Sequence, residues 1–291
     1  MSAWRLVYCA VLAVFVALAA DESSYRSSIE RWRQQQETEL KADDGWLSVA
    51  GLFWLKDGRN TAGTDTASDI ALPRGPASAG VFEFHDGRTI FHPGTGSGAT
   101  VNGQPAGEST PLKDDSKGTP DQVKIDRLTM FVIHRGNRFG IRMRDPDSKL
   151  RREFTGLHWF PPKDNYRVNA QFIRNNPPLT IAIPNILGEV IQEASPGYVQ
   201  FTLEGKSLRL DPIMEGHELF FIFRDETAGK ETYPAGRFLK AEFPKNNTVV
   251  LDFNKAYNPP CAFTPYATCP LPPKQNRLPI RIEAGEMNYR H

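Results

Sequence analysis

The chain has 291 residues, a formal net charge of +1, and 23 glycines and 23 prolines. The near-balance of acids and bases excludes a chain-wide basic surface for nucleic acid and an acidic tail for a cationic partner. Because turn residues are plentiful and helical heptads are absent, we expect a mainly β fold with antiparallel, sandwich-like or barrel-like sheets. We also expect an N-terminal amphipathic helix and a proline-rich C-terminal loop.

The first twenty residues have the features of a secretory signal peptide. Arg5 precedes an apolar run over residues 6–18, and small residues follow it directly before Asp21. The run is too short to span a membrane comfortably, so we expect cleavage near residue 20 and export to the periplasm or the extracellular space. An uncleaved anchor is the alternative. After cleavage we expect no stable membrane span.

Residues 21–45 are predicted to form a surface helix that lies on a core. Charged and glutamine side chains surround most of it, while the large apolar side chains fall near one face, namely Tyr25, Ile29, Trp32 and Leu40. From residue 46 to residue 291 we expect one β-rich domain, with a candidate internal boundary near residues 115–122.

Short candidate strands separated by glycine turns fill most of the remaining chain. Residues 81–85 and 89–92 flank Asp86-Gly87, a dipeptide typical of a tight hairpin. Asp57-Gly58 and Asn102-Gly103 are further hairpin signals. Later strands recur at intervals of about ten residues, which indicates a sandwich or a barrel.

Residues 138–144 are predicted to form a strand with one apolar and one cationic face. Side chains alternate along a strand, so Arg138, Arg142 and Arg144 share the cationic face. Three arginines on one face can bind an anion. The simpler interpretation is that they are solvated and pair with acidic residues nearby in the chain, namely Asp145, Asp147 and Glu153.

Residues 252–286 stand out because they combine many prolines with cysteines, asparagines and tyrosines. Proline removes a backbone donor and restricts φ, so this stretch can be neither a long helix nor a central strand. Irregular segments that a scaffold holds in place are common locations for function. We therefore expect the functional site near this segment.

Cys261 and Cys269 are the two cysteines that remain once Cys9 is removed with the signal peptide. An even pair in an exported chain predicts a disulfide that closes a small loop. A two-thiolate metal site and a reactive thiol are the alternatives. Since the pair lacks the tight spacing of structural zinc sites and the histidines are scattered, we predict no metal site and no cofactor.

Several polar side chains are candidates for chemistry or for ligand binding. His158 is a candidate general base, and Asp252 is the carboxylate that we expect to act with it, with Glu231, Glu283 and Glu286 as further carboxylates. The groups that can hold a small polar or anionic ligand are Tyr233, Arg237, Asn254, Tyr257, Asn258, Asn276 and Arg277. The alternative is that these side chains satisfy the backbone of proline-rich loops or pair with carboxylates.

Several motifs resemble the signatures of one protein family in the same order along the chain. They are Asp-Gly-Trp-Leu-Ser-Val-Ala-Gly-Leu-Phe-Trp-Leu at 44–55, Gly-Leu-His-Trp-Phe-Pro at 156–161, Asp-Phe-Asn-Lys-Ala-Tyr-Asn-Pro-Pro-Cys at 252–261, Cys-Pro-Leu-Pro-Pro at 269–273, Asn-Arg-Leu-Pro at 276–279 and Glu-Ala-Gly-Glu at 283–286. The family is DUF1684, a group of bacterial and archaeal proteins of unknown function. The resemblance implies no activity and no catalytic residue.

The combined features predict an exported, β-rich protein that binds a small polar or anionic ligand through its C-terminal polar loops. An envelope hydrolase-like enzyme that uses His158 with a carboxylate is one alternative, and a structural or partner-binding envelope protein is another. A pocket that unites His158, Tyr233, Arg237, Asp252 and Arg277 would favour the first two interpretations, and dispersal of these residues would favour the third. We expect no nucleic-acid partner, and the oligomeric state stays open.

Overall fold

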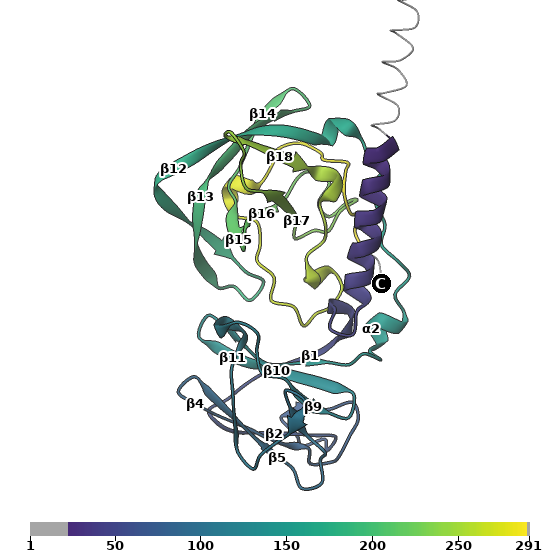
Figure 1. Cartoon of the computed structure of the whole chain (residues 1–291), viewed down its shortest axis with the longest axis vertical. Helices are drawn as coiled ribbons and strands as arrows, with labels where there is room; N and C mark the ends of the chain where they lie inside the picture. The colour runs from purple at the N-terminus through teal and green to yellow at the C-terminus, as the bar shows by residue number, and fades with distance from the viewer. Residues whose placement is uncertain (1–22, 290–291) are drawn as a thin grey trace, which may run out of the picture. The chain divides into compact units, whose positions relative to one another are not determined.

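The computed structural model describes residues 23–289, which form two compact units (Figure 1). Among the described residues, unit 1 comprises 23–39, 156–262 and 270–289, and unit 2 comprises 40–155 and 263–269. Unit 2 therefore includes a short piece of the proline-rich C-terminal stretch whose two flanks belong to unit 1. The predicted signal peptide lies outside the described residues.

Unit 2 contains two sheets. The first has the order β1-β11-β10-β9-β6-β7 and the second has the order β3-β2-β4-β5-β8. All neighbouring strands are antiparallel except the parallel pair β2 and β3. The strands are β1 (Val49–Trp54), β2 (Gly58–Gly63), β3 (Ile70–Ala71), β4 (Gly80–His85), β5 (Arg88–Pro93), β6 (Thr100–Val101), β7 (Gln104–Pro105), β8 (Thr110–Leu112), β9 (Val123–Ile125), β10 (Leu128–Arg135) and β11 (Arg138–Arg144).

Two of the predicted hairpins form where their turn residues allow it. Asp86 and Gly87 have φ angles of 47° and 74°, and β4 pairs with β5 across them. Asn102 and Gly103 join β6 to β7 in the same way, with φ angles of 50° and 79°. Positive φ at both central residues is what a two-residue hairpin turn requires. The third prediction was wrong, because Gly58 begins a strand that belongs to the other sheet from β1.

The core of unit 2 comes from apolar side chains of both sheets. Phe82 and Phe91 are fully buried and their ring centroids lie 4.9 Å apart. Met130, Val132 and Ile141 contribute from the first sheet. Alternating residues of each strand therefore face this core, as a sandwich requires. The short helical segments of this unit are η1 (Trp46–Ser48), η2 (Asp115–Lys117) and α2 (Lys149–Arg152).

Unit 1 contains a four-stranded sheet of order β14-β13-β12-β18 and a three-stranded sheet of order β15-β16-β17. Its strands are β12 (Arg167–Pro184), β13 (Val190–Leu203), β14 (Lys206–Leu210), β15 (Ile213–Glu215), β16 (Glu218–Phe223), β17 (Arg237–Glu242) and β18 (Thr248–Asp252). Its 3-10 turns are η3 (Asp164–Tyr166), η4 (Phe253–Lys255), η5 (Pro260–Ala262) and η6 (Lys274–Asn276). The last three divide the proline-rich stretch into short turns.

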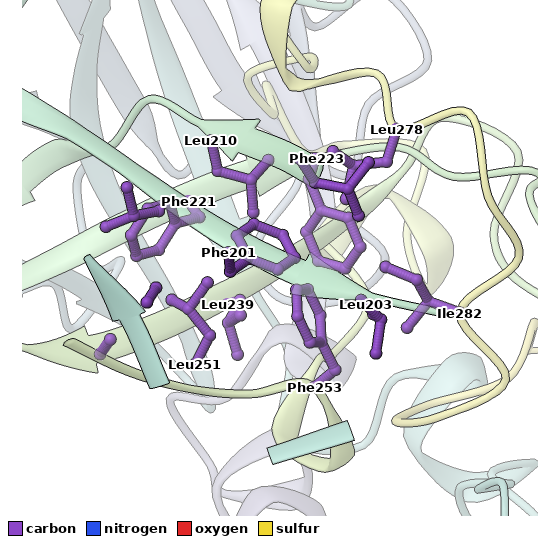
Figure 2. Packing of buried hydrophobic residues seen from close by; sticks show 14 of the residues in the cluster. Phe201, Leu203, Leu210, Phe221, Phe223, Leu239, Leu251, Phe253, Leu278 and Ile282 are labelled. Atoms are coloured by element: carbon purple, nitrogen blue, oxygen red, sulfur yellow. The ribbon is translucent and has the colours of Figure 1, made fainter. Parts of the chain in front are cut away.

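One apolar cluster holds the two sheets of unit 1 together with the end of the chain (Figure 2). Phe253 lies against Phe201 and Phe223, with ring centroids 5.7 and 5.6 Å away. Leu278 and Ile282 come from the C-terminal segment. Phe223 and Phe253 are completely buried, so this irregular segment is part of the core.

An α-helix over residues 23–41 lies beside the C-terminal part of unit 1 (Figure 1). Ile29 is completely buried, which confirms the predicted apolar face. Arg33 shares that face and donates from Nη2 to the carbonyl oxygen of Phe160, at 2.8 Å. The long stem of an arginine can cover apolar surface while its head finds an acceptor.

The predicted mainly β, antiparallel fold with an N-terminal helix is confirmed. No sheet closes into a barrel over residues 23–289, because each has two distinct end strands. No helix within the same range is both long and apolar enough to span a membrane.

Candidate functional site

Residues 282–287 form the centre of the candidate site in unit 1. The backbone of this segment accepts a hydrogen bond at Gly285 O from Phe160 N, at 2.9 Å, and donates from Met287 N to His158 O, at 2.8 Å. Gly285 has φ of 79°, and a Cβ there would lie 2.5 Å from the carbonyl oxygen of Ala256. Only glycine fits this approach, so the segment is held tightly against η4.

Arg237 on β17 holds the same segment through hydrogen bonds to its backbone. Its side chain is 1% exposed, and Nη2 lies 2.7 Å from Asp225 Oδ2. The same nitrogen donates to Ile282 O, at 3.0 Å, and Nη1 donates to Ala284 O. Burial lowers the pKa of this guanidinium, whereas the Asp225 carboxylate opposes that shift. Arg237 therefore forms a neutralised ion pair that also holds the backbone of residues 282–284.

Glu286 and Asn258 form the polar centre of the site. Asn258 donates from its backbone N to Glu286 Oε2 and from Nδ2 to Oε1, both at 2.8 Å. Asn258 Nδ2 also donates to the carbonyl oxygen of Met287, at 2.8 Å. Burial raises the pKa of Glu286 to about 8, although the Asn258 bonds and Arg237 act in the opposite direction. The carboxyl is therefore mostly protonated at neutral pH.

Asn258 Oδ1 is buried and has no hydrogen-bond partner among the residues that the structure describes. Since Nδ2 faces two acceptors, the orientation of the amide follows from its surroundings. An unpaired buried carbonyl oxygen costs about 1–3 kcal/mol. The site therefore presents one acceptor that the chain itself does not satisfy.

Three half-buried aromatic rings lie around this polar centre. Trp159 forms a β-bridge with Glu286, and its ring meets Trp32 edge to face with centroids 5.5 Å apart. Tyr257 directly precedes Asn258, and its ring centroid lies 6.5 Å from that of Trp32. Burial and nearby carboxylates raise the pKa of the Tyr257 hydroxyl. The rings add apolar surface to the segments that carry Asn258 and Glu286.

Asp252 and Asn254 lie in a separate cluster that anchors the N-terminal helix. Tyr25 donates its hydroxyl to Asp252 Oδ1, at 2.8 Å, and accepts from Asn254 Nδ2, at 2.9 Å. Asn254 also exchanges two hydrogen bonds with the backbone of Lys163. Burial raises the pKa of Tyr25, and Asp252 raises it further. These contacts join the helix, β18 and the segment before β12.

Asn276 and Arg277 are neighbours with contrasting surroundings. Asn276 is 1% exposed and saturates the backbone N and O of Asp211 and the carbonyl oxygen of Ile222, at 2.8 to 3.0 Å. The side chain of Arg277 is exposed, and its backbone bridges to Arg224. Asn276 thus satisfies the hydrogen-bonding groups of the loop backbone.

Tyr233, His158 and the cysteines complete the predicted set. Tyr233 donates its hydroxyl to Cys261 O, at 2.9 Å. The imidazole of His158 is exposed, and it takes part in no side-chain hydrogen bond among the described residues. Cys261 is half-buried and Cys269 is buried, and the disulfide between them stays a prediction.

The structure brings together only part of the predicted set. Arg237, Asn258 and the backbone of His158 all meet residues 282–287, while Asp252 and Asn254 meet Tyr25 instead. Sequence reasoning missed Asp225, Trp32 and Tyr25 as partners. Asp225 carried a usable signal, because a buried arginine needs a carboxylate and Asp225 lies two residues after the end of β16. Over residues 23–289, no group of three or more acidic, histidine or cysteine side chains is placed to hold a metal ion.

Comparison with known proteins places this site in a family of unknown function. Residues 152–287 match the family described as "Protein of unknown function (DUF1684)". The chain is also similar to an uncharacterized protein of Haloarcula marismortui known from a solution NMR structure. The two are 32% identical over 47% of this chain and 78% of that one, with a TM-score of 0.40. No curated protein matches the chain.

Proposed function

This chain belongs to the DUF1684 family, whose function is unknown, and we propose that it binds a small, uncharged polar ligand at the Asn258–Glu286 site. The observation that carries the proposal is the buried Asn258 Oδ1, which has no hydrogen-bond partner within residues 23–289. Folded proteins rarely leave such an acceptor unpaired. A donor group of a ligand would satisfy it.

The charges of the site favour an uncharged ligand. Asp225 neutralises Arg237, and the raised pKa of Glu286 keeps that carboxyl protonated near neutral pH. An anion would find no unpaired cation here, and a cation would find no unpaired carboxylate. Hydroxyl or amide groups, which donate hydrogen bonds without a net charge, fit both polar side chains.

The aromatic rings support the same class of ligand. Ligand sites commonly combine aromatic walls with a few placed polar groups. Trp32, Trp159 and Tyr257 supply the rings, and Asn258 and Glu286 supply the polar groups. No comparable arrangement supports the hydrolase alternative, because the described hydrogen bonds join no carboxylate to the His158 imidazole.

Export and the Cys261–Cys269 disulfide belong to the same proposal. A charged start, a short apolar run and small residues before Asp21 support export. In an oxidising compartment, the even number of cysteines in the mature chain favours a disulfide. Intact mass measured without reductant tests both, because it reports the missing N-terminal residues and the loss of two thiol protons.

Native mass spectrometry of protein purified from the envelope, followed by thermal-shift assays with glucose, N-acetylglucosamine, trehalose and acetamide, tests the binding function. We expect an uncharged compound to raise the melting temperature of the wild type. Asn258→Leu should remove the effect, and circular dichroism should show that this variant is folded.

The pH dependence provides a second readout with a matched variant. Wild-type binding should weaken as the pH rises through about 8, because Glu286 ionises. Glu286→Gln stays neutral and should bind with the same affinity at pH 6 and pH 9. If no uncharged compound is retained or stabilises the protein, the structural or partner-binding interpretation replaces this one.

A further inference from the structure

Arg142 and Arg144 of unit 2 are neighbouring cations whose Nε atoms are buried. They are two residues apart on β11, so their side chains share one face of the sheet. Arg142 is 4% exposed and Arg144 is half-buried. The Nε atoms of both are buried and have no hydrogen-bond partner in the described part of the chain.

The acidic residues that were expected to pair with these arginines bind other cations. Asp145 accepts from Arg127 Nη2 at 3.0 Å, and Asp147 Oδ2 lies 2.8 Å from Arg127 Nη1. Glu153 pairs with Lys149, at 3.9 Å. The sequence-based interpretation that these neighbours neutralise Arg142 and Arg144 was therefore wrong.

Arg142 is surrounded by aromatic and neutral polar groups. Its guanidinium lies 5.0 Å from the centroid of the Trp46 ring. Its Nη2 reaches only two long contacts, 3.4 Å to Thr268 Oγ1 and 3.5 Å to Tyr266 O. Burial lowers the pKa of Arg142 to about 10, and the charge of Arg135 lowers it further.

Arg144 has a similar environment. Its guanidinium lies 4.9 Å from the centroid of the Phe131 ring, and Phe131 is directly opposite Arg142 in the neighbouring strand. Burial lowers the pKa of Arg144, and the carboxylate of Asp44 opposes the shift without coming within ion-pair distance among the described contacts. The aromatic rings stabilise both cations but carry no net charge.

The nearest carboxylate is already used by a third arginine. Arg135 binds Asp115 with two nitrogens, at 2.9 and 2.7 Å, and its Nε donates to Thr268 Oγ1 at 3.1 Å. Thr268 thus accepts from Arg135 and Arg142. Because no described group accepts from the Thr268 hydroxyl, this hydroxyl can donate to a ligand. Of these three guanidiniums, Arg135 is the one that has a carboxylate within ion-pair distance among the described residues, which leaves a positive charge at the site.

Removing a guanidinium from water without a counter-charge is unfavourable, and proteins normally pair buried charges. A buried and a half-buried cation side by side, both with unused Nε donors, therefore point to a partner outside the chain. Arginine nitrogens match the oxygens of carboxylates and phosphates through paired hydrogen bonds. All of the residues involved belong to unit 2.

We propose that Arg142 and Arg144, with the hydroxyl of Thr268, form a binding site for a compact oxyanion, the phosphate or carboxylate group of a small molecule. The site shares no residue with the Asn258–Glu286 site. Residues 263–269 supply Thr268, so the C-terminal stretch contributes to unit 2 a ligand-binding hydroxyl as well as packing.

Isothermal titration and thermal shift of the full chain with inorganic phosphate, sulfate and acetate test the proposal. Sodium chloride keeps the ionic strength constant, and concentrations stay at or below about 10 mM so that general salting effects are small. We expect saturable binding of at least one oxyanion. A preference for phosphate over acetate would identify a phosphate group as the ligand, and the reverse preference would identify a carboxylate.

Three variants separate the site from general charge effects. Arg142→Met should weaken binding by about tenfold or more, the loss expected for one charge-assisted hydrogen bond. Arg142→Lys keeps the charge and the fold but removes the paired donors, and should also weaken binding. Arg59→Met removes an exposed arginine of unit 2 and should leave the affinity unchanged. Absence of saturable binding, or equal affinity in wild type and both Arg142 variants, would overturn the proposal.

Discussion

Arg237 in unit 1 and Arg142 in unit 2 are both buried arginines on β-strands, but the charges around them differ. Arg237 lies 2.7 Å from Asp225 and donates to carbonyl oxygens of the C-terminal segment. Arg142 has no carboxylate within ion-pair distance among the described residues, and its Nε has no partner. Both arginines are thus buried, but only Arg237 has a carboxylate that neutralises its charge.

The difference separates a structural cation from a candidate binding cation. An ion pair such as Arg237–Asp225 connects segments and leaves no net charge to attract a ligand. An unpaired guanidinium has N–H donors that point in a fixed direction, and an anion from outside the chain can accept hydrogen bonds from them. Charge balance around a buried arginine is therefore more informative about function than burial itself.

Breaking the Arg237 pair should have the largest effect. Arg237→Met leaves Asp225 buried without its counter-ion, so we expect a loss of about 3–5 kcal/mol in the free energy of unfolding. Urea denaturation followed by circular dichroism measures this. The double variant Arg237→Met/Asp225→Leu should recover much of the loss. A single-variant loss below about 1 kcal/mol would contradict the structural role.

Removing Asn276 should have the next largest effect. Asn276→Ala leaves the backbone N and O of Asp211 and the carbonyl oxygen of Ile222 unpaired, so we expect a loss of about 2–4 kcal/mol. Arg277→Ala is the matched control, since this neighbour is exposed and should change stability by less than about 0.5 kcal/mol. Equal losses in the free energy of unfolding of the two variants would show that the hydrogen bonds of Asn276 do not stabilise the fold.

The Glu286 carboxyl predicts a dependence of stability on pH. Its pKa of about 8 in the folded state lies above its ordinary value of 4.5, so the folded state binds more protons than the unfolded state between these values. Stability should therefore fall as the pH rises, by about 2 kcal/mol between pH 6 and pH 8. Glu286→Gln should lack this loss. Urea denaturation of both proteins at pH 6, 7 and 8 measures this loss. The same fall in the free energy of unfolding with pH in the variant would show that Glu286 does not cause it.

Arg142→Met should have the smallest effect on stability and the opposite tendency from Arg237→Met. In a buffer without phosphate or carboxylate, the substitution removes a desolvated cation that has no counter-ion. We expect no loss, or a gain of about 1 kcal/mol. Urea denaturation under the conditions used for Arg237→Met gives a direct comparison. A loss of about 3 kcal/mol or more would mean that the chain itself satisfies Arg142.

Local patterns predicted much of the fold and less of the sites. The Asp86-Gly87 and Asn102-Gly103 hairpins formed because two adjacent residues supply the positive φ that the turn needs. Asp57-Gly58 failed as a hairpin signal because strand pairing also depends on distant partners, and β1 pairs with β11 instead. The polar residues of the C-terminal stretch were found by composition, but their partners were not.

The amino-acid sequence by itself determined the β-rich class, the helix on residues 23–41, the short hairpins and the place of the chain in its family. These features depend on periodicity, turn residues and motifs that are read within a few neighbouring positions. Only the tertiary structure decided that Arg237 meets Asp225 while Arg142 meets Trp46 and Thr268. The surroundings of a buried arginine depend on which segments pack against it, at a separation of 12 residues for Asp225 and Arg237 and of 126 for Thr268 and Arg142, and such contacts leave no local pattern.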